Sequence, residues 1–408
     1  MAQFKTMFSN FKTKIVSFFA KKQKRNFIIV FLSAVILISA SVSIASFCAS
    51  KYPDYIYIDT EEDLNKIRNN LDGDFVFTKQ NIDIKQDWIP IGTKEKPFSG
   101  TIVGNGCTIS FAKKDFSFVE GDENYFGFFA NNNGTIKNLI FYLHDMNLLS
   151  NNNNPSVFGC VSAYNAGTIS NCSVVQASGE VKLTASNDVY AGGMCGTGAH
   201  NFLKSKSAVK FDITTDGNVY GGGISGAFND VTDVWEISTT AQFTIHKSST
   251  FLCGGIVGVA NEKAKTKITN CLSRSTFYCF DANDGLCSGI ISKSLSDSFV
   301  VKNCNSENNF TNNENTKNSN YVGDGMFEVS NCVSSPNFSN DKSGLYFGSF
   351  SYKELSSSSF ENCYYTKKYQ NSFEKYGEFF ELADLTISKL NWDGKIWRKN
   401  ADGSFSLV

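Results

Sequence analysis

Apolar residues recur along this chain in two short patterns that return together about every thirty residues. The first pattern is a strand of alternating polar and apolar residues that ends in Asn and then Cys or an aliphatic residue, as in TIKNL, TISNC and KITNC. The Asn-equivalent positions are 138, 171, 204, 236, 270, 303, 331 and 362, so the successive intervals are 33, 33, 32, 34, 33, 28 and 31 residues. A regular period of this length predicts a solenoid or a propeller.

The second pattern is a glycine-centred apolar run, seen as YFGFFA, YGGGISG and LCGGIVG. Glycine adopts backbone angles closed to other residues and lets two turns approach closely, so we expect it at the corners of a repeat. The central glycines keep step with the first pattern and are Gly127, Gly159, Gly193, Gly223, Gly255 and Gly289.

Each repeat reads as two or three short strands broken by Gly, Asn, Asp and Ser. A unit of this size cannot bury its own apolar face, so the repeats must stack. The sequence therefore predicts an all-β parallel β-helix of eight or nine turns, in which equivalent side chains lie about 4.8 Å apart as ladders. Lys204 and Glu236 stand in two weaker copies of the ladder position. The other members are Asn138, Asn171, Asn270, Asn303, Asn331 and Asn362, followed by the interior residues Cys172, Cys271, Cys304, Cys332 and Cys363.

The glycine runs, each followed by an Asn-bearing loop and a GTIxN strand, resemble the GLUG-motif repeats of large secreted and surface proteins. The resemblance covers roughly residues 53–408 and implies a right-handed parallel β-helix. It implies little about activity, because function lives in sites grafted onto folds.

The first 25 residues carry seven Lys or Arg and no acid, and Phe4, Phe8, Phe11, Ile15 and Phe18 fall at helical spacing. This pattern predicts a basic amphipathic helix at an anionic membrane surface. A disordered basic tail is the alternative, and a mitochondrial presequence is disfavoured because Arg25 is the single arginine in this stretch.

Residues 26–48 are predicted to form a transmembrane signal anchor. Positions 27–47 contain no charge, which is long enough for one membrane-spanning helix, and KKQKR before them would keep the N-terminus in the cytoplasm. A signal peptide cleaved near Ser43 and Ala45 is the competing interpretation and would make the protein secreted.

Both ends of the solenoid need covers, because an open β-helix end invites pairing with another chain. Residues 53–99 are the expected N-terminal cap, with a capping box at Thr60 and Asp63 and a short helix that presents Leu64, Ile67 and Leu71. The repeats are expected over residues 100–366, and residues 367–408 are expected to close the far end with Trp392 and Trp397 as core anchors.

Charge and cysteine content narrow the class of protein further. The chain has a net charge of −1, and removing the +7 of its first 25 residues leaves −8, which argues against a nucleic-acid surface. Of twelve Cys, eleven lie beyond Cys48 and none forms a CxxC pair. Neighbouring ladder Cys could bridge, but buried thiols acting as small apolar residues are favoured.

Candidate chemistry is sparse. The three histidines, His144, His200 and His246, form no close pair, so no catalytic, cofactor-binding or metal-binding residue is predicted. DANDG at 281–285 resembles the start of a calcium loop, but Ser292 stands where its bidentate Glu belongs, which favours a simple turn. Sequons begin at Asn133, Asn171, Asn309 and Asn337 and are weak indicators in so Asn-rich a chain.

These patterns favour a membrane-anchored, extracytoplasmic β-solenoid that is not an enzyme and acts in adhesion, surface display or structure. Its expected partners are a membrane crossed once and a host-cell, matrix or glycan ligand, with no nucleic acid. One alternative is a polysaccharide-processing enzyme on the same scaffold, since carboxylates can come together from different turns. A membrane scaffold in an organelle lumen is the other.

Overall fold

The computed structural model describes residues 50–111, 115–120, 123–279, 282–312, 316–338, 347–369 and 372–408. The expected basic segment (1–25) and membrane anchor (26–48) lie outside these residues. Within the described ranges, no helix combines the length and the apolar character needed to cross a membrane. The chain divides into two compact units, residues 1–54 and 55–408, and the fold below is that of the second.

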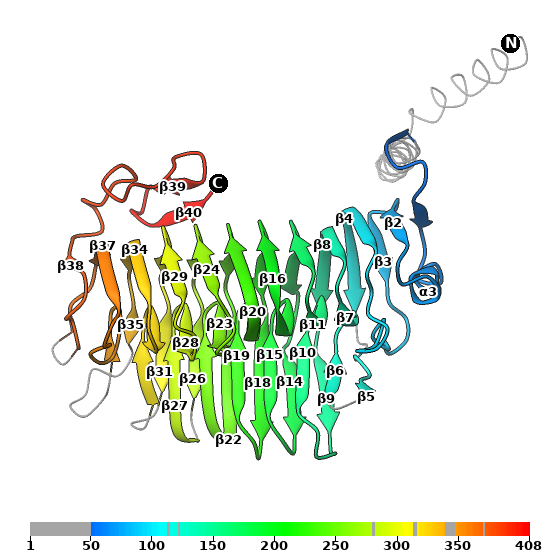
Figure 1. The fold of residues 1–408 in the computed structure, drawn as a ribbon, viewed down its shortest axis with the longest axis horizontal. Coiled ribbons are helices and arrows are strands. Elements are labelled where there is room, and N and C mark those ends of the chain that lie inside the picture. The colour runs from blue at the N-terminus through cyan, green and yellow to red at the C-terminus, as the bar shows by residue number, and fades with distance from the viewer. Residues whose placement is uncertain are drawn as a thin grey trace, which may run out of the picture. The chain divides into compact units, whose positions relative to one another are not determined.

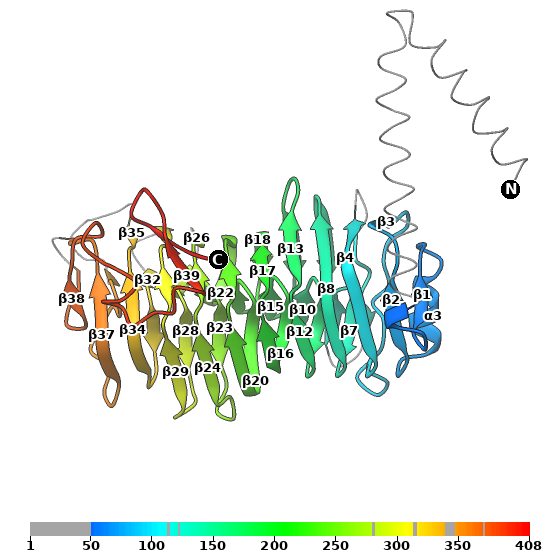
Figure 2. The ribbon, with the colours of Figure 1, turned by 90° about the horizontal axis from the view of Figure 1, so that it is seen from above.

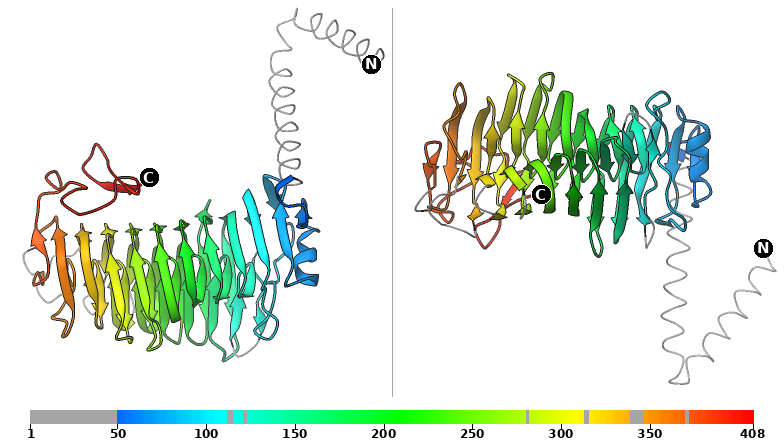
Figure 3. Two further views of the ribbon diagram at one scale, coloured as in Figure 1. Left: turned by 45° about the horizontal axis from the view of Figure 1, so that its top comes forward. Right: turned by 90° about the horizontal axis from the view of Figure 1, so that it is seen from below.

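This unit is a parallel β-solenoid, in which strands stack in sequence order from β2 (Asp74–Phe77), next to α3 (Leu64–Asn69), to β38 (Glu378–Phe379) (Figure 1). Figures 2 and 3 show the same order from other sides. The larger sheet has 23 strands: β1 (Ile56–Ile58), β2 (Asp74–Phe77), β3 (Asn81–Asp83), β4 (Thr101–Phe111), β7 (Phe129–Asn132), β8 (Thr135–Leu143), β11 (Ser162–Asn165), β12 (Thr168–Ser170), β13 (Ser173–Gln176), β16 (Cys195–Leu203), β17 (Lys206–Ala208), β20 (Ser225–Trp235), β21 (Ser238–Thr239), β23 (Val257–Ala260), β24 (Thr266–Thr269), β25 (Leu272–Ser273), β28 (Ile291–Ser294), β29 (Phe299–Lys302), β30 (Asn305–Ser306), β33 (Val322–Asp324), β34 (Glu328–Ser334), β37 (Ser359–Tyr365) and β38 (Glu378–Phe379).

The second sheet has 15 strands: β5 (Val119–Glu120), β6 (Asn124–Phe126), β9 (Met146–Ser150), β10 (Ser156–Gly159), β14 (Val181–Ala185), β15 (Val189–Gly192), β18 (Lys210–Thr215), β19 (Val219–Gly222), β22 (Gln242–Gly254), β26 (Thr276–Cys279), β27 (Ala282–Ser288), β31 (Asn309–Asn312), β32 (Thr316–Ser319), β35 (Asn337–Phe338) and β36 (Phe347–Gly348). A separate antiparallel pair joins β39 (Trp397–Lys399) to β40 (Phe405–Leu407). The predicted all-β parallel solenoid is therefore confirmed.

The two sheets enclose an interior built from columns of equivalent side chains. One column stacks the rings of five phenylalanines from successive turns, with centroids 5.1 to 5.8 Å apart. Its members are Phe211, Phe243, Phe277, Phe310 and Phe338. Because each large apolar side chain contributes roughly 1.5 to 3 kcal/mol when fully buried, this column helps to hold the turns together.

The Asn positions of the repeat form a ladder at an outer corner of the solenoid. Each has a left-handed backbone, with φ of 54° at Asn303 and 53° at Asn331. Four of the side-chain amides, those of Asn171, Asn303, Asn331 and Asn362, donate to the ladder Asn of the preceding turn. Asn171 donates to Asn138 over 2.7 Å, and Asn303 donates to Asn270 over 3.2 Å. Asn tolerates this conformation better than most residues, because its short polar side chain can hydrogen-bond locally.

The gap in the Asn ladder is filled by charges. Lys204 and Glu236 share the left-handed backbone, with φ of 49° and 54°. The Lys204 ammonium lies 3.7 Å from the Glu236 carboxylate, so an ion pair replaces the amide contact between these two turns.

The cysteines that follow the ladder point inward and are buried. Each thiol donates to the carbonyl two residues before it, as Cys304 does to Lys302 over 3.2 Å. The five repeat-position cysteines are Cys172, Cys271, Cys304, Cys332 and Cys363, and all remain thiols.

The expected glycine column needs a correction of register. Gly159 pairs with Gly192, not with Gly193, so Gly127 and Gly159 belong to one column and Gly193, Gly223, Gly255 and Gly289 to the next. The sequence could not separate the two columns, because the runs contain two or three glycines in succession. Close approach explains the second column, since a Cβ on Gly255 would lie 2.1 Å from the Gly289 carbonyl oxygen.

The N-terminal end is covered by α3 (Figure 1). The Asp63 amide donates to the Thr60 hydroxyl and the Thr60 amide donates to the Asp63 carboxylate, both over 3.2 Å, which is a capping box. Leu64 and Ile67 are fully buried against the first strands, and Leu71 is partly buried.

The C-terminal segment was expected to close the far end, and its first part lies there: β38 pairs with β37, and Tyr369 and Tyr376 pack against the last turn. Its later part, with the two expected anchors, instead lies along one wall of the solenoid. Trp392 and Trp397 are buried in a small apolar cluster that includes Leu272, Val333 and Tyr364 of β25, β34 and β37. The Trp392 indole donates to the carbonyl of Asn331 over 2.7 Å. The segment folds back because these strands expose apolar side chains that only a covering segment can bury.

Candidate functional site

The three histidines lie in different parts of the solenoid and form no common centre. His144 contacts the Ser178 hydroxyl over 3.0 Å, and His246 contacts the Asp212 carboxylate over 3.1 Å. Within the described ranges, no group of three His, Cys, Asp or Glu could hold a metal ion.

The DANDG segment is a strand where the sequence indicated a turn. Its described residues belong to β27, which pairs with β22 and β32. Pairing on both sides outweighs the local turn preference, and Asp284 binds Lys317 over 2.9 Å.

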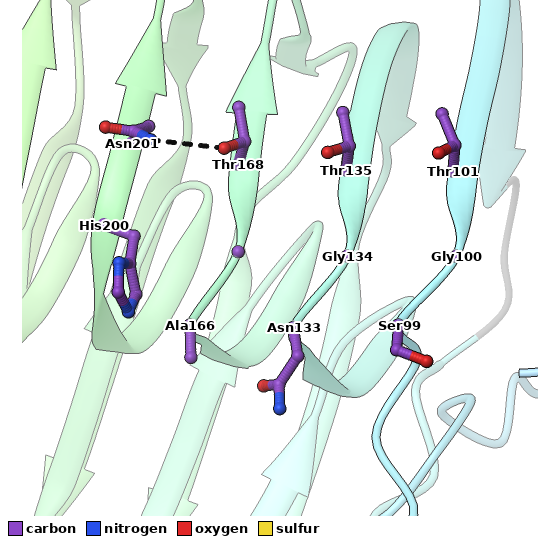
Figure 4. A pocket seen from close by; sticks show the side chains of 11 residues that line it. Ser99, Gly100, Thr101, Asn133, Gly134, Thr135, Ala166, Thr168, His200 and Asn201 are labelled. Carbon is purple, nitrogen blue, oxygen red and sulfur yellow. Dashed lines mark hydrogen bonds between the residues drawn. The ribbon is translucent and has the colours of Figure 1, made fainter. Parts of the chain in front are cut away.

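An open polar groove crosses four turns near the N-terminal end (Figure 4). Its floor follows Gly100, Gly134 and Gly167, where the preceding turn passes so close that a Cβ would lie 1.9 to 2.2 Å from a backbone carbonyl oxygen. The other lining residues are Ser99, Thr101, Asn133, Thr135, Ala166, Thr168, His200 and Asn201.

The upper edge of the groove belongs to what we call the front wall, the strand segments in register with residues 135–137. Figure 4 shows Thr101, Thr135 and Thr168 directed alike, with Asn201 donating to the Thr168 hydroxyl over 3.3 Å. Strand pairing extends this row in both directions, through Asp74 before it and Asp233 after it. Hydroxyl, amide and carboxylate groups therefore follow one another up the wall, about 4.8 Å apart.

Trp235 lies on the same wall, two residues after Asp233 in β20. Its side chain is partly exposed, whereas Trp88, Trp392 and Trp397 are buried. The Lys204 ammonium lies 5.0 Å from the centre of the Trp235 ring and is paired with Glu236. Alternation in TDVWE already places Val234 inside and its two neighbours outside, so the sequence carried a signal for this residue that the repeat analysis passed over.

A second carboxylate comes from an irregularity in β20. Gly198 pairs with Phe228 but His200 pairs with Thr232, so β20 has two more residues than β16 between the same pairs. This bulge exposes Asp230, and Val231 is 52% exposed. Bulges redirect side chains and recur beside active sites. Two exposed carboxylates thus lie three positions apart on one strand, and Asp233 is two residues from the aromatic Trp235.

No known protein family and no curated protein sequence matches the chain. Two solved structures resemble its fold. A protein from Bacteroides ovatus, named as a candidate immunoglobulin A1 protease, is 16% identical with a TM-score of 0.43, and the match covers 86% of this chain and 92% of that one. A structure named IgA1 protease is 14% identical with a TM-score of 0.45, and the match covers 84% of this chain and 26% of that one.

The expectation of a non-catalytic adhesion or display protein is corrected by these comparisons, because both structures bear the names of enzymes. At such low identity the likeness concerns the fold alone, so neither proteolysis nor its substrate is transferred to this chain. The β-solenoid built of repeats is shown by the strand pairing of the chain itself, while the GLUG motif is not matched.

Proposed function

We propose that this protein is a polysaccharide-processing enzyme that holds its substrate on the front wall. The observation that carries the proposal is the partly exposed Trp235, two residues from Asp233. Asp233 itself is in register with the hydroxyls of Thr135 and Thr168 and the amide of Asn201. A sugar ring offers an apolar C–H face to an aromatic side chain and hydroxyls to polar groups, which is the mixture that this wall presents.

The chemistry would rest on Asp230 and Asp233. Glycoside hydrolysis uses two carboxyl groups, one that protonates the leaving oxygen and one that acts as base or nucleophile. Asp233 is exposed and stands in register with Asn201 at the end of the groove row, while Asp230 is exposed in the bulge. We assign Asp233 as the residue nearer the substrate row and Asp230 as its partner.

We further propose that the solenoid works outside the cytoplasm, held by the apolar segment at 27–47, and that its repeats are right-handed and of the GLUG type. The long uncharged segment behind a basic stretch supports this location. Protease treatment of intact cells that carry an epitope tag after Val408 tests it. Loss of the tag supports an exterior solenoid, and a protected tag contradicts it.

The enzymatic proposal is tested with the full chain and a panel of soluble neutral and acidic polysaccharides, by measuring new reducing ends. Asp233→Asn should abolish their release. Trp235→Ala should raise KM by about 10- to 150-fold, if the lost stacking is worth roughly 1.5 to 3 kcal/mol.

Asp216→Asn is the matched control. Asp216 is an exposed carboxylate that follows β18 of the second sheet, away from the front wall, and pairs with Lys247. The variant should retain activity. The proposal fails if the wild-type chain cleaves none of the polysaccharides, or if Asp233→Asn is as active as the wild type.

A further inference from the structure

Two cysteines outside the repeat ladder contact each other. The sulfur atoms of Cys279 and Cys287 lie 3.5 Å apart, and both residues are fully buried. The ladder thiols are arranged differently: each donates to backbone carbonyls, and Cys304 lies beside the ladder thiols of its neighbouring turns, Cys271 and Cys332. Cys279 and Cys287 instead face each other from two strand positions of one turn.

The register of the strands shows that this contact is particular to one turn. Cys279 aligns with Ile245 in the turn before and with Asn312 in the turn after. Cys287 aligns with Cys253 and Asn318. These two facing positions are thus occupied by Ile and Cys, then by Cys and Cys, then by Asn and Asn. Among these three turns, two thiols face each other within one turn in the middle one alone.

We propose that Cys279 and Cys287 are a disulfide-forming site, which becomes oxidised when the chain folds in an oxidising compartment. Cys279 is the last residue of β26 and Cys287 lies within β27, so the bond would link two strands of the second sheet. The sulfur atoms need to approach by only about 1.5 Å to reach bonding distance.

The oxidant is a disulfide, either of small molecules or of a thiol–disulfide oxidoreductase. One cysteine thiolate attacks a sulfur of that disulfide and releases one thiol, which leaves a mixed disulfide on the protein. The second cysteine thiolate then displaces the other thiol, so two protein thiols are oxidised and one external disulfide is reduced to two thiols. Burial raises the pKa of the Cys279 thiol, and thiolates are the attacking species, so the bond should form before the turn closes.

The test folds the full chain from the reduced, denatured state in buffers of oxidised or reduced glutathione. Remaining thiols are alkylated in denaturant, and the peptides are identified by mass spectrometry. After oxidative folding, Cys279 and Cys287 should be joined, while Cys304 and Cys332 should be alkylated. The oxidised protein should also melt at a higher temperature than the reduced protein.

Two variants separate the proposed pair from its neighbour. Cys279→Ser should leave Cys287 open to alkylation and should remove the difference in melting temperature between the two buffers. Cys253→Ser should leave the bond and that difference intact, although Cys253 aligns with Cys287 in the preceding turn. Full alkylation of Cys279 and Cys287 after oxidative folding would overturn the proposal, and so would a bond between Cys253 and Cys287.

Discussion

Asn303 allows the two contributions of the Asn ladder to be measured separately. Its amide donates to Asn270 and accepts from Asn331, each over 3.2 Å, and its backbone has φ of 54°. Asn303→Gly keeps the left-handed backbone but removes both hydrogen bonds, which should cost about 2 kcal/mol at about 1 kcal/mol for each. Asn303→Ala should cost roughly 1 kcal/mol more, because a Cβ disfavours this conformation.

Differential scanning calorimetry on the full chain measures the effect. With about 2 cal/mol/K of unfolding entropy per residue, a loss of 3 kcal/mol should lower the melting temperature of the solenoid by roughly 4 °C. Asn147→Ala is the control, because Asn147 is exposed in the middle of β9, where the backbone is extended. Equal melting temperatures for the Gly and Ala variants would refute the backbone argument, and a Gly variant as stable as the wild type would refute the hydrogen-bond argument.

Two further predictions concern packing and pH. Gly255→Ala should destabilise the solenoid by at least 1 to 3 kcal/mol, since the new Cβ would overlap the Gly289 carbonyl, whereas Gly394→Ala meets no atom within 4 Å and should be nearly neutral; equal denaturation midpoints would contradict the close approach. Burial raises the pKa of Glu374; Ser349 donates to its Oε1 atom, but its Oε2 atom has no hydrogen-bond partner. The ionised carboxylate therefore lowers the free energy of unfolding. This loss of stability is absent at low pH and appears as pH rises past the unfolded pKa. Glu374→Gln should therefore raise the melting temperature around pH 7 and leave it unchanged around pH 4, and an equal shift at both would refute this account.

Part of this protein's structure could be deduced from the spacing of residues in the sequence alone. The interval of about 33 residues between Asn171 and its neighbours indicates stacked turns, because only stacking can bury the apolar face of so short a unit. The capping box at Thr60 and Asp63 was also readable, since its two hydrogen bonds join residues three positions apart. Local hydrogen bonds and a repeat period are properties of short stretches, which a sequence displays directly.

Tertiary structure decided the features that depend on registration between turns. Trp235 acquires its place beside the Thr168 row because strands some thirty residues apart align, and the bulge that exposes Asp230 changes that alignment by two residues. The contact between Cys279 and Cys287 likewise depends on how two strands face each other across the interior. A period locates equivalent residues only to within a position or so, whereas side-chain contacts require the alignment to be fixed to a single residue.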